Sequence, residues 1–223
     1  MHCVSQKNIY TLSFKKKPHI DSIARQLPDD SVAYFEDIKL KTEQYWAVTD
    51  INPKVYGFQI QRGTKWLSGL QAAELADFER RLGFTFPEAL RNYYRTMNGT
   101  DTLAINVYGS QGEPPAYRPR LYSYPRDLAE IEALIEWIYA ENQLTMAEAQ
   151  QQGISRIMPM YSHRFMLIDI PGNPILSMYG RDIIYYADNL SKLLANQLLH
   201  TITHGSEFES DPRNAPVIKF WID

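Results

Sequence analysis

The segment GLQAAELADFERRLG, residues 69–83, carries the clearest structural signal in the chain. Its apolar residues Leu75, Phe78 and Leu82 recur at the spacing of one helical face, and a glycine follows where a left-handed C-terminal cap is favoured. The next segment, PEALRNYYRTMNG at 87–99, begins with a proline, which suits the first turn of a helix, and ends at Asn-Gly. Together the two segments predict a short helical hairpin.

The last third of the chain alternates in the manner of β-strands. The segments ISRIMPMY, RFMLIDI, PILSMYG and DIIYYA, between residues 154 and 187, are separated by turn residues and predict a meander of four short strands. Asp188 is expected to cap a final helix rich in leucine. This order of strands and helix pairs predicts an α+β fold, with an antiparallel or mixed β-sheet and helices packed mainly on one side.

Between the hairpin and the meander the pattern is mixed. Residues 100–120 are rich in proline and glycine and are typical of a loop, whereas 120–124 predict a strand. Asp127 is a candidate cap for a helix over residues 128–141. The sequence TMAE at 145–148 has the spacing of a capping box, which predicts a further short helix.

The N-terminal part has a different texture, because β-branched and aromatic residues cluster between turn-forming ones. Four such segments occur, at 8–14, 31–38, 44–50 and 54–61. We therefore expect residues 1–60 to be a β-rich N-terminal extension packed on the main domain. The main domain is expected to span 61–204, and residues 205–223 to form a C-terminal tail.

The composition excludes several classes of protein. The chain of 223 residues has 23 basic and 26 acidic side chains, a net charge of −3, and so lacks the basic field that holds nucleic-acid phosphates. No apolar run approaches the roughly 18 residues of a membrane helix, and the N-terminus lacks the apolar core of a secretory signal. The single cysteine, Cys3, cannot form an internal disulfide. We expect a reduced, cytoplasmic protein that binds neither nucleic acid nor membrane.

Two parts of the chain resemble a known family. The hairpin and its flanks carry Trp66, Gly69, Leu70, Phe78, Glu79, Leu82, Gly83, Pro87, Leu90, Arg91, Tyr94, Asn98 and Gly99. The second half carries Met158-Pro159, Leu167-Ile168-Asp169, Asn173-Pro174-Ile175 and the segment DIIYYADNL. In order and spacing these residues resemble the SUKH superfamily, in its Smi/Knr-like branch, over about residues 66–199. The chain departs from the family at Gln71, where the family usually places Thr or Ser as the helix cap.

This resemblance implies a non-enzymatic protein-binding domain. Bacterial members are most often immunity proteins that neutralise a cognate polymorphic or contact-dependent toxin, frequently a nuclease. Related eukaryotic members look more like regulators of cell-wall synthesis or signalling, so a regulatory or scaffold interaction module is the alternative. The residues of the family pattern expected to be structural are Trp66, Glu79, Gly83, Pro87, Asn98 and Gly99.

The sequence contains none of the phosphate-loop, dinucleotide, zinc-protease or nucleophile-elbow motifs. His200 and His204 have helical i, i+4 spacing, with Glu207 as a third candidate ligand, and would suit a metal-dependent hydrolase, but histidines at a helix end also interact with the last carbonyls. Asp169 and Asp182 could converge if their strands were neighbours, although Asp is ordinary at turns. We expect no catalytic residue, cofactor or metal.

The helix at 128–141 is the leading candidate for a binding surface. Trp137 falls outside its apolar stripe, between Glu130 and Glu141 on nearly the same line. A tryptophan among acidic residues could anchor a basic partner, because aromatic anchors are enriched at interfaces and complementary charge speeds association. The alternative is that Trp137 packs under a neighbouring segment. A second candidate surface is the loop that contains Tyr117, Arg118 and Tyr122.

Overall fold

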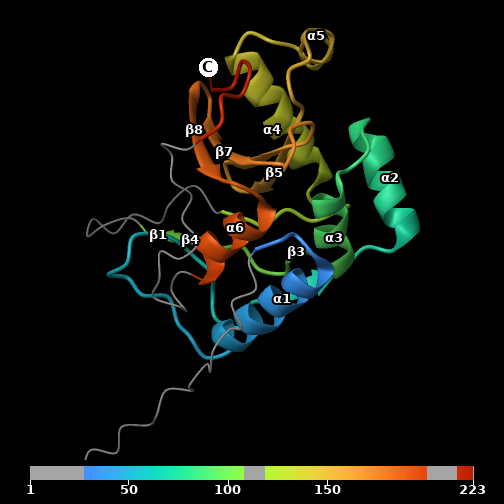
Figure 1. The fold of residues 1–223 in the computed structure, drawn as a ribbon. Helices are drawn as coiled ribbons and strands as arrows, with labels where there is room; N and C mark the ends of the chain where they lie inside the picture. The colour runs from blue at the N-terminus through green and yellow to red at the C-terminus, as the bar shows by residue number, and fades with distance from the viewer. Residues whose placement is uncertain (1–27, 108–118, 200–214, 223) are drawn as a thin grey trace, which may run out of the picture.

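A four-stranded antiparallel sheet lies at the centre of the computed structural model, which describes residues 28–107, 119–199 and 215–222 (Figure 1). Its strands are adjacent in chain order: β5 (Ile157–Tyr161), β6 (Arg164–Leu167), β7 (Ile175–Tyr179) and β8 (Asp182–Ala187). Every residue of β5 is buried, so both faces of the sheet are covered there. The predicted meander is confirmed.

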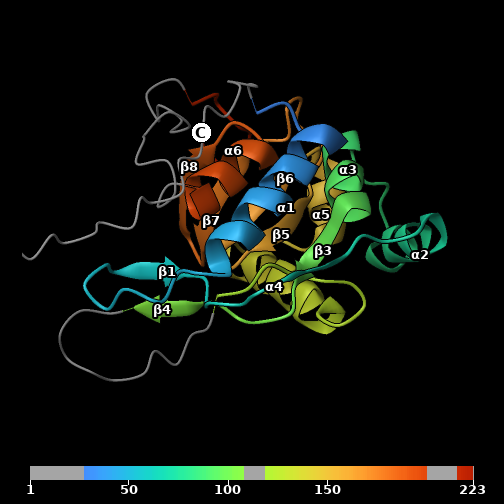
Figure 2. The same ribbon diagram turned by 90° about the horizontal axis from the view of Figure 1, so that it is seen from below.

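Helices lie on both faces of this sheet. On one face are α1 (Val32–Trp46) and α6 (Leu190–Leu194), which continues as a π-helical turn at Ala195–Leu199; on the other is α4 (Leu128–Glu141) (Figures 1 and 2). Asn189, not Asp188, caps α6, because the Asn189 side chain accepts the Lys192 N–H at 2.8 Å. The α+β class predicted from the sequence is confirmed, although the helices are not confined to one side.

The helical hairpin forms as predicted, from α2 (Ala72–Leu82) and α3 (Glu88–Thr96). Gly83 ends α2 in the left-handed conformation, with φ 75°, and its N–H donates to the Glu79 carbonyl at 2.9 Å. At the start of α2 the backbone N–H of Gln71 donates to the Glu74 carboxylate at 2.8 Å. This bond caps the helix without the Thr or Ser that the family usually has at this position.

Two small antiparallel sheets join the hairpin to the rest of the fold. The first pairs β2 (Trp66–Ser68) with β3 (Met97–Thr100), and the second pairs β1 (Gly57–Gln59) with β4 (Ile105–Val107). The short helix α5 (Met146–Gln152) begins with the predicted capping box, in which Thr145 and Glu148 bond reciprocally.

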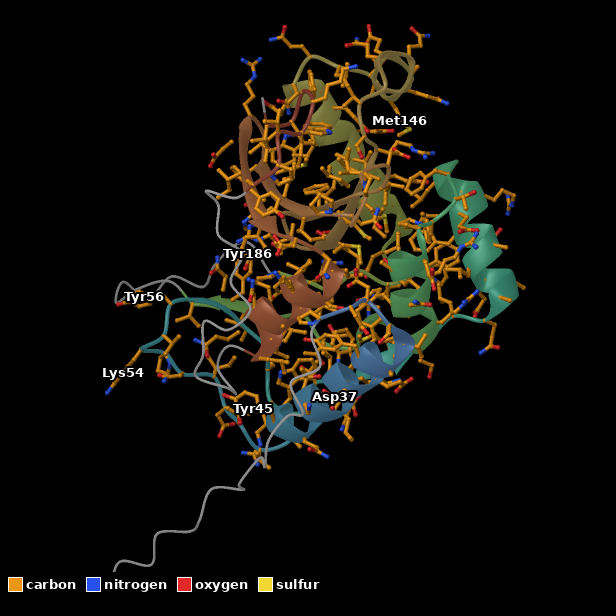
Figure 3. The ribbon with its side chains drawn as sticks, viewed as in Figure 1. Asp37, Tyr45, Lys54, Tyr56, Met146 and Tyr186 are labelled. Atoms are coloured by element: carbon orange, nitrogen blue, oxygen red, sulfur yellow. The ribbon has the colours of Figure 1, made fainter. Side chains whose placement is uncertain are left out.

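The prediction of strands at 31–38 and 44–50 is wrong, because the single helix α1 occupies residues 32–38 of the first segment and 44–46 of the second, and residues 47–50 form a turn and a loop (Figure 3). Ser31 caps this helix by accepting the Tyr34 N–H at 3.1 Å. The aromatic and β-branched residues that suggested strands recur at helical spacing and form one buried face: Tyr34, Phe35, Ile38, Thr42 and Trp46. In the segment 54–61 only Gly57–Gln59 forms a strand. The candidate strand at 8–14 lies outside the described residues.

Two further expectations need correction. Residues 120–124 do not form a strand, since Leu121 makes an isolated bridge to Tyr161 and no ladder follows. Asp127 stands at the N-cap of α4, but its carboxylate turns back to accept the Ser123 N–H at 2.9 Å instead of bonding the helix.

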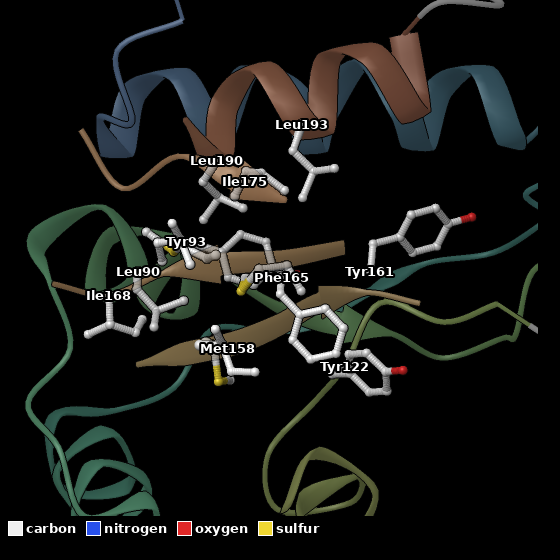
Figure 4. Close-up of a cluster of buried hydrophobic side chains, with 14 of the residues drawn as sticks. Leu90, Tyr93, Tyr122, Met158, Tyr161, Phe165, Ile168, Ile175, Leu190 and Leu193 are labelled. Carbon is white, nitrogen blue, oxygen red and sulfur yellow. The ribbon is translucent and has the colours of Figure 1, made fainter. Parts of the chain in front are cut away.

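The hydrophobic core fills the space on both sides of the central sheet. Figure 4 shows Leu190 and Leu193 extending from α6 toward the strands, with Phe165 and Tyr122 on the other side. All four side chains are at most 1% exposed. This continuous packing fixes the positions of α4 and of the turns at the sheet ends.

A candidate protein-binding surface

The outer side of α4 is acidic. The helix contains four glutamates, Glu130, Glu132, Glu136 and Glu141, and no lysine or arginine. Its apolar stripe of Ile131, Ile135 and Ile138 is buried, so the glutamates lie toward solvent. The helix therefore combines a firm hydrophobic attachment with a negatively charged outer side.

Trp137 lies at the border between that acidic side and the β7–β8 turn. Its ring is half-buried and stands edge-on to the ring of Tyr179, with a centroid distance of 5.4 Å and an interplanar angle of 76°. Tyr179 itself is 69% exposed. Trp137 thus packs against the end of the sheet, beneath an exposed tyrosine.

The β7–β8 turn is held onto the end of α4 by hydrogen bonds. Arg181 Nε donates to the backbone carbonyl of Glu141 at 2.7 Å. The Asn142 side chain donates to the carbonyls of Gly180, at 3.1 Å, and of Ile138, at 2.8 Å. These bonds join the two elements into one rigid unit, which lowers the entropic cost of binding a partner.

The glutamates of α4 have different surroundings. Glu130 forms an ion pair with Arg120 at 2.8 Å, and the same Arg120 nitrogen reaches Asp127 at 3.2 Å. Glu141 is exposed beside the β7–β8 turn: a methyl group placed on Gly180 would lie 3.7 Å from its carboxylate and 3.9 Å from the Trp137 ring. No ion pair involves Glu141 within the described residues. The structure therefore brings Trp137 and Glu141 together, whereas Glu130 is partly neutralised.

A row of aromatic rings continues from Tyr179 across the sheet end. The ring centroid of His163 is 6.5 Å from that of Tyr179, and the ring centroid of Phe58 in β1 is 5.7 Å from that of His163. Burial, together with the charge of Arg164, lowers the pKa of His163 to about 4, so the ring is uncharged at neutral pH. The sequence analysis missed Tyr179 and His163. Their one visible signal is position, since each adjoins a turn between two predicted strands.

The second candidate surface is not supported in the same way. Tyr122 is 1% exposed and its hydroxyl donates to the Ser162 carbonyl at 3.3 Å, so the prediction that it contacts a partner is wrong for this structure. The error came from treating Tyr122 as part of an exposed loop. Tyr117 and Arg118 lie outside the described residues.

Glu79, in the family pattern, is enclosed by hydrogen bonds. Its carboxylate accepts the Phe86 N–H at 2.8 Å and two bonds from Arg91, at 2.8 and 3.1 Å. Burial alone would raise the pKa of Glu79, but these bonds outweigh burial and lower it. Glu79 thereby joins the end of α2 to α3.

Other residues of the family pattern are also interior. Trp66 donates from Nε1 to Thr42 at 2.8 Å, and Asn98 bonds both the N–H and the carbonyl of Tyr124. Gly99 has φ 71°, and a Cβ there would lie 2.6 Å from the Leu121 carbonyl oxygen, which leaves no room for a side chain. Pro87, which is half-buried, stands at the N-cap of α3. The contacts of Trp66, Asn98 and Gly99 each link one element to another.

The described residues contain no group of three or more His, Cys, Asp and Glu that could hold a metal ion. Asp169 is bonded by Arg156 through the backbone N–H and Nε, both at 2.9 Å. Asp169 and Asp182 do not come from neighbouring strands, because β7 lies between β6 and β8. His200, His204, Glu207 and Cys3 are outside the described residues.

A cavity of about 580 Å³ lies between the end of α1, the strand β1 and the π-helical turn. Aromatic rings of Tyr45, Trp46 and Phe58 line it. At its rim, the Gln59 side chain bonds the backbone of Asn52 in both directions at 2.8 Å. This polar edge is therefore engaged within the fold.

Comparison with known proteins places the chain in a family. Among the described helices none has the length and apolar character needed to cross a membrane. No curated protein matches the chain. A family model, the SMI1 / KNR4 family (SUKH-1), matches residues 69–197, which include α2, α3, α4 and the whole central sheet. This match covers more than half of the length of the chain, and the chain therefore belongs to the SMI1 / KNR4 family, SUKH-1.

Proposed function

We propose that this protein is a non-enzymatic immunity protein that neutralises a cognate bacterial toxin by stoichiometric binding. Two observations support the proposal. SUKH domains are generally immunity-type proteins without enzymatic activity, and this chain has a SUKH domain. The observation that carries the proposal is the rigid surface of Trp137, Tyr179 and Glu141 at the end of α4, since aromatic and acidic side chains on a fixed support suit a protein interface.

The mechanism is occlusion. The immunity protein covers the active site or substrate groove of the toxin, and no bond is made or broken. A nuclease is a suitable toxin, because its substrate groove is basic and would attract the acidic side of α4. We expect the complex to form in the cytoplasm and to involve neither nucleic acid nor membrane.

The division of the chain into parts remains a prediction. We assign binding to the domain at 61–204, which contains the family match at 69–197. Residues 1–60 are proposed as an extension of that domain. Its described portion includes α1, which bonds α3 through Lys39 and the Thr96 carbonyl at 2.9 Å. Residues 205–223 are proposed as the tail.

The test is co-expression. A toxin-like protein encoded beside the gene is expressed in a sensitive host together with this protein. In a parallel culture the Leu40→Ala variant, changed on the exposed side of α1, replaces this protein as the matched control. Rescue of growth and recovery of a one-to-one complex are expected. No rescue and no complex would refute the immunity role and favour the regulatory scaffold.

A further inference from the structure

Tyr179 is the most exposed aromatic ring described in the central sheet, at 69%. It ends β7, and its ring meets Trp137 edge-on at 5.4 Å. Tyrosine offers a large contact area with few rotatable bonds, so an exposed, supported tyrosine is well suited to a protein interface. The fold uses Trp137 to hold this ring and leaves most of the ring uncovered.

The surroundings of Tyr179 are negatively charged. Asp182 lies opposite Tyr179 in the β7–β8 register, and Glu141 lies against the same turn. Both carboxylates belong to exposed residues, and neither has an ion pair among the described residues. Arg181 is the cation in this turn, and its Nε is already engaged with the Glu141 carbonyl.

The His163 ring beside Tyr179 carries no positive charge that would repel a cation. His163 stands 6.5 Å from Tyr179 and is uncharged at neutral pH because burial and Arg164 hold its pKa near 4. A positively charged group on Tyr179 would therefore meet a neutral ring on one side and carboxylates on the other. Cations are attracted to the faces of aromatic rings, and an arginine can stack on a tyrosine while bonding a carboxylate.

We propose that Tyr179 is the centre of the partner-binding surface and receives an arginine or lysine side chain of the partner, flanked by Glu141 and Asp182. This inference rests on the proposed function for the identity of the partner. It specifies the chemistry of the contact: a cation on an aromatic face, with carboxylates at its rim. Glu130 lies outside this contact, because Arg120 already pairs with it.

The first experiment needs no toxin. The isotope-labelled full chain is titrated with the peptide acetyl-Gly-Arg-Gly-Arg-Gly-amide, and the same peptide with citrulline in place of arginine is the neutral control. We expect the largest amide shifts at residues 179–182 and at the Trp137 indole N–H. The Tyr179→Phe variant should keep these shifts, whereas Tyr179→Ala should lose them. Shifts that follow exposed carboxylates everywhere, including α2, or that persist in Tyr179→Ala, would overturn the inference.

The second experiment separates this inference from the proposed function. Affinity for the adjacent toxin is compared between Tyr179→Ala and the matched control Leu40→Ala, which also removes an exposed apolar side chain, 58% exposed on α1. We expect Tyr179→Ala to weaken binding at least about tenfold and the control to bind normally. Toxin binding by both variants at full strength would refute the role of Tyr179 and leave the immunity function standing. Arginine-peptide binding at Tyr179 without any toxin rescue would refute the immunity function alone.

Discussion

Two glutamates on different helices of the fold have opposite surroundings. The side chain of Glu79 on α2 is 16% exposed and accepts three hydrogen bonds, from Phe86 and Arg91. Glu141 on α4 is exposed and has no ion pair within the described residues. The same residue type is thus part of the architecture in one helix and part of a free surface in the other.

The residues of the family pattern therefore differ from the residues of the proposed partner surface. Glu79, Asn98 and Gly99 belong to the family pattern, and each joins one element to another inside the fold. Tyr179 and Glu141 are not in that pattern and lie on the surface. A binding family can therefore keep its scaffold while its surface residues set the partner, because specificity is a difference of affinities between partners.

The largest expected effect is a loss of stability when a buried residue of the scaffold is replaced. Phe78 is fully buried and contacts the rings of Phe86, Tyr94 and Tyr124 at centroid distances of 4.4 to 5.2 Å. Phe78→Ala should lower the free energy of unfolding by about 3–5 kcal/mol, through lost burial and the cavity left behind. Urea denaturation followed by circular dichroism measures this loss. Wild-type stability in the variant would show that α2 is not anchored by this ring.

A smaller loss is expected for Glu79→Gln, which keeps the size of the side chain but removes its charge. The free energy of unfolding at pH 7 should fall by about 1–3 kcal/mol, because Arg91 loses its anionic partner. The loss is no larger because the Arg91 side chain is partly exposed and can be solvated by water. The pKa of Glu79 is lowered in the folded protein, so its stabilisation is present above the unfolded pKa of about 4.3 and is lost as the pH falls through the folded pKa. Denaturation curves should therefore converge for the two proteins at acidic pH. A constant difference at all pH values would contradict the charge effect.

On the surface side, charge reversal should change binding and leave stability nearly unchanged. The double variant Glu136→Lys/Glu141→Lys is expected to unfold within about 0.5 kcal/mol of wild type, since both residues are exposed. Its affinity for the toxin should fall at least about tenfold, mainly through slower association. The matched control is the double variant Glu36→Lys/Glu88→Lys, which changes the net charge equally at exposed glutamates of α1 and α3. Equal weakening by the control would indicate a general charge effect and not a local surface.

The smallest effect on stability and affinity is expected at Glu130. This residue is less enclosed than Glu79 but, unlike Glu141, it has an ion pair. Glu130→Ala removes an ion pair with Arg120, but Arg120 still reaches Asp127 at 3.2 Å. Stability should change by about 0.5 kcal/mol or less, and toxin affinity should stay within about twofold of wild type. A large loss of affinity, measured by calorimetry, would move the contact surface along α4 toward Arg120.

The sequence predicted the elements whose periodicity is unbroken. The α2–α3 hairpin, α4 and the four-strand meander all follow from apolar spacing and turn residues. It failed at α1, where Tyr34, Phe35 and Ile38 are typical of strands by composition and the helical spacing of the buried residues outweighs that preference. Local propensity is a weak guide where tertiary burial decides the conformation.

Only part of the candidate surface could be predicted, because some of it depends on local helical geometry and the rest on long-range packing. Helical geometry alone places Trp137 and Glu141 on one line of α4. The contribution of Tyr179 depends on how the β7–β8 turn meets α4, through Asn142 and Arg181, which no local pattern encodes. The burial of Tyr122 likewise depends on long-range packing against β5 and the following turn.

The most direct measurement of the central claim is calorimetric titration of the purified toxin domain with this protein, read together with the residual activity of the toxin. Occlusion predicts a one-to-one complex with a dissociation constant on the order of nanomolar and a loss of toxin activity proportional to the protein added. Loss of toxin activity at a small fraction of one equivalent would mean that the protein acts on the toxin chemically, and the absence of binding heat and complex would contradict the account altogether.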